Sequence, residues 1–420
     1  MPSLSKRIRI TFLLSLLATL ILPIFLQANP TSALTSEKKD RILESIDNIL
    51  NKRAFALEAD FSEWNTHIET HRTPIAEAQT PEAFAKAVRK ALSEFGVSHT
   101  NVSPPVQTQA RRQAKQVGLI GIYMSEHEEE YIVNKIARSS PAYAAGIRKL
   151  DTIVKIDGHP PKEAHKYYKP DATTRKLKWI RNGISYEKSV SIYPFTPNDP
   201  PSLRWIGEDI AVIEIMSFAS KQYHRKQTSR LLKKVKNAKG VILDLRGNFG
   251  GLTYNYRHLA SRFISNGKTF NYRIDKPTQR RSQKKLNTAN PSWDEMLPFA
   301  KKIGFWRQGF VYQGPIVVLI DEYCASGGDL FPAVLKEQSG ATLIGRKTEG
   351  ALIASRTKAL PFGYSLQHPI YEIATPEGRR LEGNGQKPDI ALSVRETADD
   401  EYIFKLAVDE IERKLRREQK

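Results

Sequence analysis

One short stretch, residues 324–329, combines a serine with two glycines in a way that could support nucleophilic chemistry. It follows the continuous apolar run 316–320, which is typical of a strand buried on both faces, and it precedes a helical pattern at 330–335. Glycines in a strand-to-helix turn lift a side chain into the open and let backbone N–H groups approach a substrate. We therefore interpret Ser326 as a candidate nucleophile and the Gly327 N–H as a donor to developing negative charge. Taken alone, the stretch fits a tight turn with an incidental serine equally well.

A second glycine-rich turn occupies residues 243–251, which read LDLRGNFGG, again between a strand pattern and a helical pattern. Its glycines would let a backbone N–H turn into a cleft. The turn lacks the Gly-Lys-Ser/Thr ending of a phosphate-binding loop, so we do not interpret it as one.

Two other reactive residue types give weaker signals. His67 and His71 are four apart, but Ile68 stands where a zinc peptidase pattern needs glutamate, so we expect a surface helix and no metal site. Cys324 is the single cysteine, and it cannot form an internal disulfide. We expect it to be a small buried residue rather than a nucleophile.

The composition is that of a globular protein with a strongly basic balance. At 420 residues, 40% of them hydrophobic, the chain is long enough for two or three domains. A net charge of +20 and a pI of about 9.7 suit nucleic acid, an anionic membrane surface or an acidic envelope polymer as partner. Because the basic residues are spread over the whole length, we favour a solvated basic surface, with membrane-surface association as the alternative.

The N-terminal residues indicate export. Lys6, Arg7 and Arg9 precede an apolar run at 10–26, and small residues follow it. This order predicts a secretory signal peptide over residues 1–28, and hence a periplasmic or secreted protein. An uncleaved anchor is the alternative, because the run is only a little short of the ~20 residues that span a bilayer. Export argues against a nucleic-acid partner.

The rest of the chain divides into four parts. Apolar residues at helical spacing predict an N-terminal helical module at 34–110, which ends in a polar linker. Short strands dominate 111–197, and strands alternate with helices over 198–400, which indicates an α/β fold. A polar, basic stretch at 268–313 interrupts the alternation, and we interpret it as a cap or lid. A C-terminal helix is expected at 401–420.

Residues 139–158, SSPAYAAGIRKLDTIVKIDG, resemble part of a PDZ domain, with a short helix, an Asp-x-Ile strand and an Ile-Asp-Gly turn. A PDZ domain binds an extended peptide by strand addition and captures its terminal carboxylate with backbone N–H groups. The resemblance implies that substrates present a free C-terminus, and the alternative is a small β domain without a ligand. The implied capturing loop is Gly118, Leu119, Ile120 and Gly121.

Together, the motifs LDLRGNFGG and ASGGD, in this order and after a PDZ-like segment, resemble the C-terminal processing (tail-specific) peptidase family over roughly residues 36–412. The resemblance implies an α/β catalytic core of the crotonase/ClpP-like type, with an N-terminal helical module and an inserted β-rich PDZ domain. It also implies a serine-type peptidase that needs no cofactor. Ser326 would be the nucleophile, and the N–H groups of Gly327 and of Gly250 or Gly251 would form the oxyanion hole.

The usual general base of this family is absent. Many members carry a lysine in a Thr-x-Gly-Lys-Gly turn and a glutamine four residues later. Here the turn reads TEGA at 348–351, and Ser355 stands at the glutamine position. Lys347 and Lys358 lie nearby but not at the turn position. Because a serine hydroxyl without a base is a poor nucleophile, the sequence argues against a lysine–serine dyad.

The tricorn-like branch of the family takes its base from the segment after the N-terminal helices. Ser98 and His99 match its Ser-His pair, and Glu382, in LEGNGQKPD, matches its glutamate. In the implied relay His99 accepts the proton of Ser326, Ser98 orients His99, and Glu382 holds the Ser98 hydroxyl. The alternative is that His99 is an ordinary loop histidine.

The sequence thus predicts an exported serine endopeptidase whose PDZ domain holds the C-terminus of a protein or peptide substrate. Two non-enzymatic alternatives are a ligand carrier, as the retinoid-binding relatives of this fold suggest, and an adaptor that recruits envelope proteins through its PDZ domain. The positions of Ser326, His99, Ser98 and Glu382 relative to one another bear most directly on the choice.

Overall fold

The computed structural model describes residues 34–113, 119–167, 173–195, 199–305 and 310–418. The signal peptide expected at 1–28 and the PDZ residue Gly118 lie outside these ranges. Within these ranges, no helix combines the length and the apolar character needed to cross a membrane.

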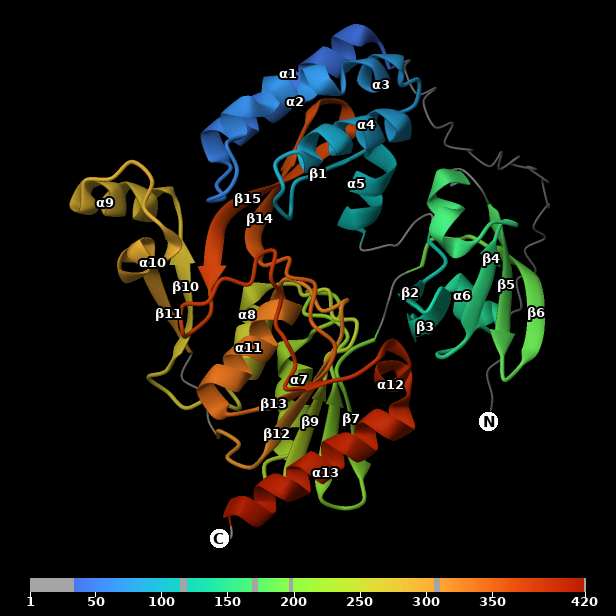
Figure 1. The fold of residues 1–420 in the computed structure, drawn as a ribbon, viewed down its shortest axis with the longest axis vertical. Helices are drawn as coiled ribbons and strands as arrows, with labels where there is room; N and C mark the ends of the chain where they lie inside the picture. The colour runs from blue at the N-terminus through green and yellow to red at the C-terminus, as the bar shows by residue number, and fades with distance from the viewer. Residues whose placement is uncertain (1–33, 114–118, 168–172, 196–198, 306–309, 419–420) are drawn as a thin grey trace, which may run out of the picture.

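A six-stranded sheet forms the centre of the largest domain (Figure 1). The strand order is β16-β13-β12-β9-β8-β7, in which all neighbours are parallel except the antiparallel pair β7 and β8. Parallel strands are covered on both faces, which explains the continuous apolar runs in this part of the sequence. The strands are β7 Ser202–Ile206, β8 Ile210–Glu214, β9 Gly240–Asp244, β12 Ile316–Ile320, β13 Thr342–Gly345 and β16 Ile390–Ala391.

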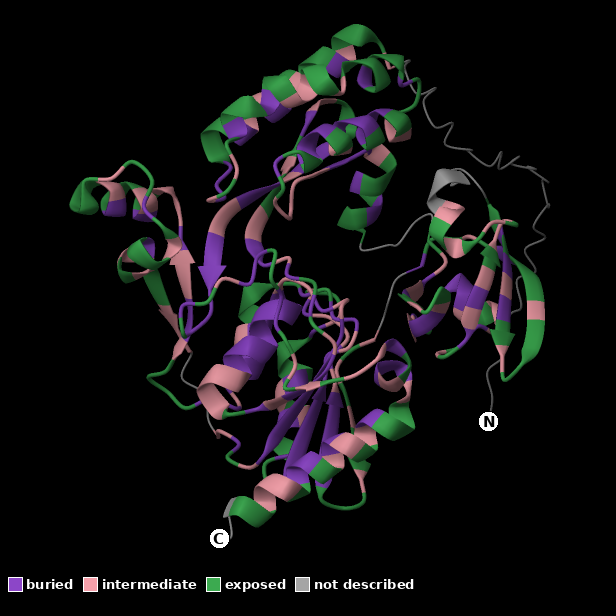
Figure 2. Cartoon of the chain, in the orientation of Figure 1, coloured by how far each residue is buried: buried purple, intermediate pink, exposed green. Residues whose placement is uncertain are grey.

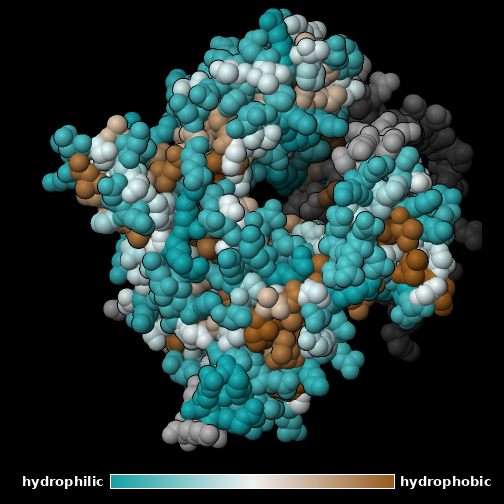
Figure 3. Space-filling view, viewed as in Figure 1, coloured by the Kyte–Doolittle hydropathy of each residue, from teal (hydrophilic) through white to brown (hydrophobic). Residues whose placement is uncertain are grey.

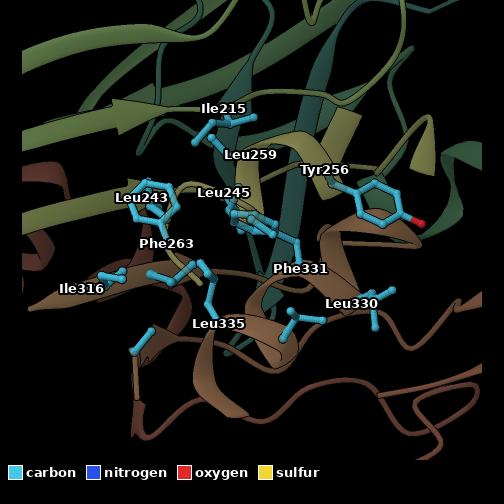
Figure 4. Packing of buried hydrophobic residues seen from close by; sticks show 14 of the residues in the cluster. Ile215, Leu243, Leu245, Tyr256, Leu259, Phe263, Ile316, Leu330, Phe331 and Leu335 are labelled. Carbon is cyan, nitrogen blue, oxygen red and sulfur yellow. The ribbon is translucent and has the colours of Figure 1, made fainter. Parts of the chain in front are cut away.

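Helices cover both faces of this sheet, so the α/β class predicted from the sequence is confirmed. One face packs against α7 Arg225–Lys234, α8 Thr253–Ala260 and α11 Gly327–Ser339. Figure 4 shows the side chains of α8 and α11 packed against those of the strands, and Figure 2 shows α11 almost wholly buried. The other face packs against α13 Asp400–Glu418, the C-terminal helix, which follows the short α12 Val394–Ala398.

A second sheet, in the order β1-β15-β10-β11 with β14 paired to β15, joins three distant parts of the chain. The stretch interpreted as a cap supplies β10 and β11, so it is a folded hairpin anchored on β15 rather than an irregular connection. The strands are β1 Asn101–Ser103, β10 Thr269–Ile274, β11 Lys301–Gly304, β14 Ile353–Ala359 and β15 Ser365–Ala374, and the hairpin carries α9 Lys276–Leu286, α10 Trp293–Met296 and the 3-10 helix η3 Leu297–Phe299.

The N-terminal module is helical as predicted, but its end is not a linker. Residues 105–112 form a helix that begins with Pro105 at its first turn, where a proline is favourable because no N–H is needed there. The module also shares a hydrophobic core with β14 and β15, through Ile353, Leu360, Tyr364 and Leu366. Its elements are α1 Ser36–Arg53, η1 Phe61–Glu63, α2 Trp64–Thr70, α3 Arg72–Glu77, α4 Pro81–Ser93 and α5 Pro105–Arg112, and η4 Pro361–Gly363 links β14 to β15.

The segment that resembles a PDZ domain forms a separate five-stranded antiparallel sheet in the order β2-β3-β4-β5-β6. Its first strand, β2, is an edge strand, which leaves one side open to strand addition. The Ser-Pro-Ala-x-x-Ala-Gly motif forms the expected short helix and ends at Gly146, whose φ of 99° is the left-handed conformation that glycine adopts freely. The elements are β2 Ile122–His127, β3 Glu130–Ile136, α6 Pro141–Ala145, β4 Thr152–Ile156, η2 Pro161–Tyr167, β5 Thr174–Arg181 and β6 Ile184–Ser191.

Candidate active site

Ser326 lies at the sharp turn between β12 and α11, directly before the first helical residue. Its φ of 56° and ψ of −111° fall outside the regions that an L-residue normally occupies. Such strain persists only when the surroundings hold the backbone in place, and it is frequent at active sites. The turn leaves Ser326 partly exposed, whereas the helix behind it is buried.

The two glycines after Ser326 are required by close approach. A Cβ on Gly327 would lie 2.6 Å from the Tyr256 ring, and a Cβ on Gly328 would lie 2.2 Å from the Asn248 carbonyl oxygen. The turn reads Ala-Ser-Gly-Gly-Asp at 325–329. The space that a side chain would need is taken here by α8 and by the 246–251 loop.

The 246–251 loop lies directly against the nucleophile turn. A Cβ on Gly250 would start 2.6 Å from the Gly327 nitrogen and 2.9 Å from the Ser326 Cβ. The Gly250 N–H donates to Asn248 Oδ1 (2.8 Å), so it serves the loop itself. The Phe218 N–H donates to the Gly250 carbonyl, and the Leu252 N–H donates to the Phe218 carbonyl. In such a parallel bridge the residue between the two bonds points its own N–H away from the partner, so the Gly251 N–H faces away from Phe218.

Two backbone donors at this junction have no partner. In the part of the chain that the structure describes, no hydrogen bond takes the N–H of Gly327 or of Gly251. Buried or half-buried N–H groups are normally paired, so two orphans beside one serine fit a site for an oxyanion. Of the two alternatives predicted from the sequence, Gly251 is therefore the better candidate beside Gly327.

Ser98, His99 and Glu382 form one hydrogen-bonded chain. The Ser98 N–H donates to Glu382 Oε1 (2.8 Å), the Ser98 hydroxyl donates to Glu382 Oε2 (3.0 Å), and Ser98 Oγ lies 2.6 Å from His99 Nδ1. An ionised carboxylate can only accept hydrogen bonds, so the Ser98 hydroxyl must donate to Glu382. The Ser98 oxygen can then accept a hydrogen bond from the His99 Nδ1–H. This arrangement selects the tautomer in which His99 Nε2 carries a lone pair.

Burial sets the protonation states of this chain. Removal from water lowers the pKa of His99 to about 4, so the imidazole is neutral at physiological pH. Burial raises the pKa of Glu382, and hydrogen bonds from Ser98 and from the Leu352 N–H oppose that effect. A neutral imidazole beside a carboxylate can accept a proton and be stabilised once it is charged.

The turn at 348–352 connects the two halves of the site. Its Ala351 carbonyl accepts from the Ser326 N–H (3.1 Å), while its Leu352 N–H donates to Glu382. Its Gly350 carbonyl accepts from the Gly383 N–H (2.8 Å), directly after Glu382. In the lysine-dependent branch this turn would carry the general base. Here it is hydrogen-bonded to Ser326 on one side and to Glu382 and Gly383 on the other.

Asp329 fixes the position of this turn relative to Ser326. Its buried carboxylate accepts from the Ser326 N–H (2.7 Å), the Thr348 hydroxyl (2.5 Å), the Gly350 N–H (2.8 Å) and the Ala351 N–H (3.2 Å). Burial raises the pKa of this carboxyl to about 6 in spite of these bonds. Asp329 also lies in the first turn of α11, where a negative charge is favourable. An acidic residue three positions after the candidate nucleophile was the available signal for its larger role.

The structure therefore brings Ser98, His99 and Glu382 into direct contact and places Ser326 on the other side of one short turn. No hydrogen bond joins the Ser326 hydroxyl to the His99 ring in the residues described. Cys324 is fully buried and its thiol donates to the Leu245 carbonyl, so the prediction of a small buried residue is confirmed.

The PDZ-like sheet contacts the two active-site loops. Lys135 on β3 donates to the carbonyls of Arg246 (3.2 Å) and Gly247 (2.8 Å). Tyr323, three residues before Ser326, donates from its hydroxyl to the Met124 carbonyl on β2. The Tyr123 ring lies 5.2 Å from that of Phe249, between centroids. No periodicity signal marked Lys135, because a lysine on a strand is usually solvated.

The loop expected to capture a C-terminus precedes β2. Gly118 lies outside the described residues, but Leu119 is exposed and Gly121 has a φ of 80° with no room for a side chain. The carbonyls of Ile120 and Gly121 accept from Ala142 and Ala137. Among the described residues no hydrogen bond takes the N–H groups of residues 119–121.

We expect Gly327→Ala to destabilise the fold by about 1–3 kcal/mol, because the added Cβ has no space beside Tyr256. Urea unfolding measures the change. Gly304→Ala is the matched control, since the nearest atom to its Cβ would be 3.9 Å away. Equal stability of the two variants would contradict the close packing described here.

Comparison with known proteins places this site in a family. Residues 209–392 match the model described as peptidase family S41, and residues 118–169 match the model of a PDZ domain. The probable CtpA-like serine protease of Staphylococcus aureus strain N315 is 27% identical over 278 residues, which cover 65% of this chain and 52% of that protein. Its counterpart in Staphylococcus epidermidis strain ATCC 12228 is 25% identical over 279 residues, 65% of this chain and 53% of that protein. The chain spans about half the length of these curated relatives.

Solved structures share the fold at low sequence identity. The photosystem II D1 C-terminal processing protease aligns with a TM-score of 0.55 and 16% identity, over 88% of this chain and 97% of that chain. Mature CPAF in complex with lactacystin aligns with a TM-score of 0.59 and 12% identity, over the same shares of the two chains. These likenesses extend across the helical module, the PDZ domain and the α/β domain. The α/β domain therefore belongs to peptidase family S41, and it follows a PDZ domain in the chain.

Proposed function

We propose that this chain is an exported serine endopeptidase that hydrolyses peptide bonds with Ser326 as nucleophile and His99 as general base. The observation that carries the proposal is the chain Glu382–Ser98–His99, which a single turn connects to the strained Ser326. Two segments far apart in the sequence, one with Ser98 and His99 and one with Glu382, supply a carboxylate, a hydroxyl and an imidazole in the order that a catalytic relay requires. A purely ligand-carrying protein has no need of this order.

In the proposed reaction, His99 Nε2 accepts the proton of Ser326 Oγ as that oxygen attacks the substrate carbonyl. The Nδ1–H of His99 stays hydrogen-bonded to the Ser98 oxygen, and the Ser98 hydroxyl donates to Glu382. These bonds stabilise the imidazolium that forms. The same proton then passes to the leaving amine, and water repeats the sequence to release the acyl group. Hydrogen bonds of this kind are often long in substrate-free enzymes and shorten when substrate binds.

The negative charge that develops on the carbonyl oxygen would be met by the N–H groups of Gly327 and Gly251. Neither has a hydrogen-bond partner among the described residues. Gly327 directly follows Ser326, and Gly251 directly follows Gly250, whose Cβ would lie 2.9 Å from the Ser326 Cβ. Each such donor typically lowers the barrier by about 3 kcal/mol, because it is already oriented before the charge appears. The N-terminal end of α11 adds its own positive potential at the same place.

The PDZ domain would hold the C-terminus of the substrate at the N–H groups of residues 119–121 and along the open edge of β2. Antiparallel or parallel pairing with β2 would direct the bound chain along a strand whose neighbours touch the active-site loops. Export is inferred from the basic and apolar N-terminal sequence alone.

A fluorophosphonate probe should label the purified protein at Ser326. Ser326→Ala should abolish labelling, and His99→Ala should slow it by ~10⁴-fold, because loss of a relay member leaves only the oxyanion hole and binding. His67→Ala and Ser355→Ala are matched controls outside the relay. Labelling that survives in both Ser326→Ala and His99→Ala would leave the protein as a non-catalytic binder on this fold.

Glu382→Gln should reduce kcat/KM for a peptide substrate by about 10- to 150-fold with little change in KM. The amide keeps the acceptor for the Ser98 N–H but removes one charge-assisted hydrogen bond of about 1.5–3 kcal/mol. Glu349→Gln, at an exposed carboxylate in the connecting turn, should behave as the parent. Steady-state kinetics decide: a pure KM effect would mean that Glu382 acts in binding rather than in the relay.

The activity should decline as the pH falls through about 6. The pKa of Asp329 is raised to about 6. Above that pH the carboxylate is charged and accepts four hydrogen bonds, and below it protonation removes the charge that fixes the turn at 348–352. Asp329→Asn should be up to ~10²-fold less active at pH 8, as expected for reacting groups misplaced by about 1 Å.

The pH profile of kcat/KM separates this role from a structural one. Asp329→Asn should lose the decline near pH 6 and keep only the one near pH 4 that belongs to His99. Thr348→Val keeps the carboxylate and removes one of its four donors, so its decline should remain near pH 6. An identical acid limb in the parent and in Asp329→Asn would exclude the role given to Asp329.

A further inference from the structure

The hairpin at 268–304, here called the basic arm, holds an unusual concentration of positive charge. It contains nine lysines and arginines against three acidic residues, so less than a tenth of the chain carries six of its 20 net positive charges. The sequence shows basic residues spread over the whole length, with a small cluster at Arg280, Arg281, Lys284 and Lys285. The fold places this cluster on one projecting element.

The charge lies on the outer side of α9. Thr278 and Ser282, one helical turn apart, are buried against the rest of the arm. Arg280, Arg281, Lys284 and Lys285 are all exposed. Lys301 and Lys302 on β11 are exposed as well and extend the same basic element.

These cations have no internal partners of opposite charge. Among the residues that the structure describes, none of the four on α9 forms an ion pair with an aspartate or glutamate. Arg281 bonds instead to Thr278 Oγ1 and to the Phe299 carbonyl, which keeps its charge unneutralised. Charges that are neither buried nor paired do little for stability, and they remain free to act on an external anionic surface.

The helices of the arm project from the β10–β11 hairpin, which is anchored on β15. Figure 1 shows α9 and α10 projecting on the side of the molecule opposite the PDZ domain, carried by β10 and β11. The main neighbours of α9 are β10, α10 and η3, within the arm itself, and Lys276 at its start donates to the Asn51 carbonyl of α1. Its outer side is therefore accessible without any change in the rest of the fold.

An exposed apolar residue accompanies the charges. Leu286 ends α9 directly after Lys284 and Lys285, and 41% of its surface is exposed. Figure 3 shows hydrophobic atoms among hydrophilic ones on this projection. A leucine next to lysines suits the boundary between lipid headgroups and acyl chains, whereas a dissolved polyanion offers it nothing to contact.

We propose that the outer side of α9 docks the protein on an anionic phospholipid surface. The four basic side chains supply the attraction to headgroup phosphates, and Leu286 inserts below them. The attraction falls off within a Debye length, about 8 Å at physiological ionic strength, so it requires the direct approach that a projecting arm allows. The inference is independent of the proposed peptidase activity.

Flotation of the full-length chain with lipid vesicles tests the proposal. Vesicles of phosphatidylcholine alone are compared with vesicles of equal parts phosphatidylcholine and phosphatidylglycerol. The arm variant is Arg280→Glu, Arg281→Glu, Lys284→Glu and Lys285→Glu together. The matched control reverses four exposed cations on α7, Lys226, Arg230, Lys233 and Lys234, and changes the net charge equally.

The arm variant should lose the phosphatidylglycerol-dependent part of binding by tenfold or more, and the α7 variant should keep most of it. All proteins retain the same N-terminal apolar run at 10–26, so any binding through that segment cancels in the comparison. Circular dichroism and thermal unfolding check that each variant is folded. If the fourfold variant fails to fold, Lys284→Gln with Lys285→Gln should give a smaller loss in the same direction. Equal losses in the arm and α7 variants would overturn the proposal.

Leu286→Ser separates a lipid surface from a soluble polyanion. On a membrane the variant should bind phosphatidylglycerol vesicles several-fold more weakly, while its binding to soluble polyphosphate should be unchanged. If Leu286→Ser binds the vesicles as the parent does, and polyphosphate at equal phosphate concentration displaces both proteins, the arm is a polyanion site and the lipid proposal fails.

Discussion

The carboxylate of Asp329 is the interaction on which the geometry of the site depends. It is buried at the start of α11, and four donors from two different loops converge on it. One donor belongs to Ser326, and the other three belong to the turn at 348–352 that reaches Glu382. A charge buried in this way is costly, as its raised pKa shows, and the cost is tolerable only because every lone pair has a partner. The same feature fixes the positions of Ser326 and Glu382 relative to each other.

Absent side chains matter as much as those present. Gly250, Gly327 and Gly328 let the two active-site loops and α8 meet at distances that no Cβ would permit. The close fit explains why glycines stand at these positions. It also brings the unpaired N–H groups of Gly251 and Gly327 to one place. The turn at 348–352 lacks the lysine of the usual branch. It makes backbone hydrogen bonds instead, to Ser326 through Ala351 and to Gly383 through Gly350.

The PDZ domain is tied to the site by polar contacts rather than by a shared core. Lys135 reaches the carbonyls of the 246–251 loop, and Tyr323 reaches β2. Burial lowers the pKa of Lys135, while nearby acidic groups, Asp321 first among them, oppose that effect. Contacts of this kind orient a loop at modest energetic cost. The helical module is joined differently, through the pairing of β1 with β15 and a continuous hydrophobic core.

The sequence by itself determined what is local. Apolar runs predicted the strands of the parallel sheet, and a short motif predicted α6, since side-chain periodicity and backbone preference act over a few residues. The roles of Ser98, His99 and Glu382 came from resemblance, because no periodicity connects residues 284 apart. Only the tertiary structure decided that residues 105–112 form a helix, that β10 and β11 join β15, and that Asp329 holds two loops together. Those outcomes depend on residues that only folding brings close together, and a pattern along the sequence does not show which residues these are.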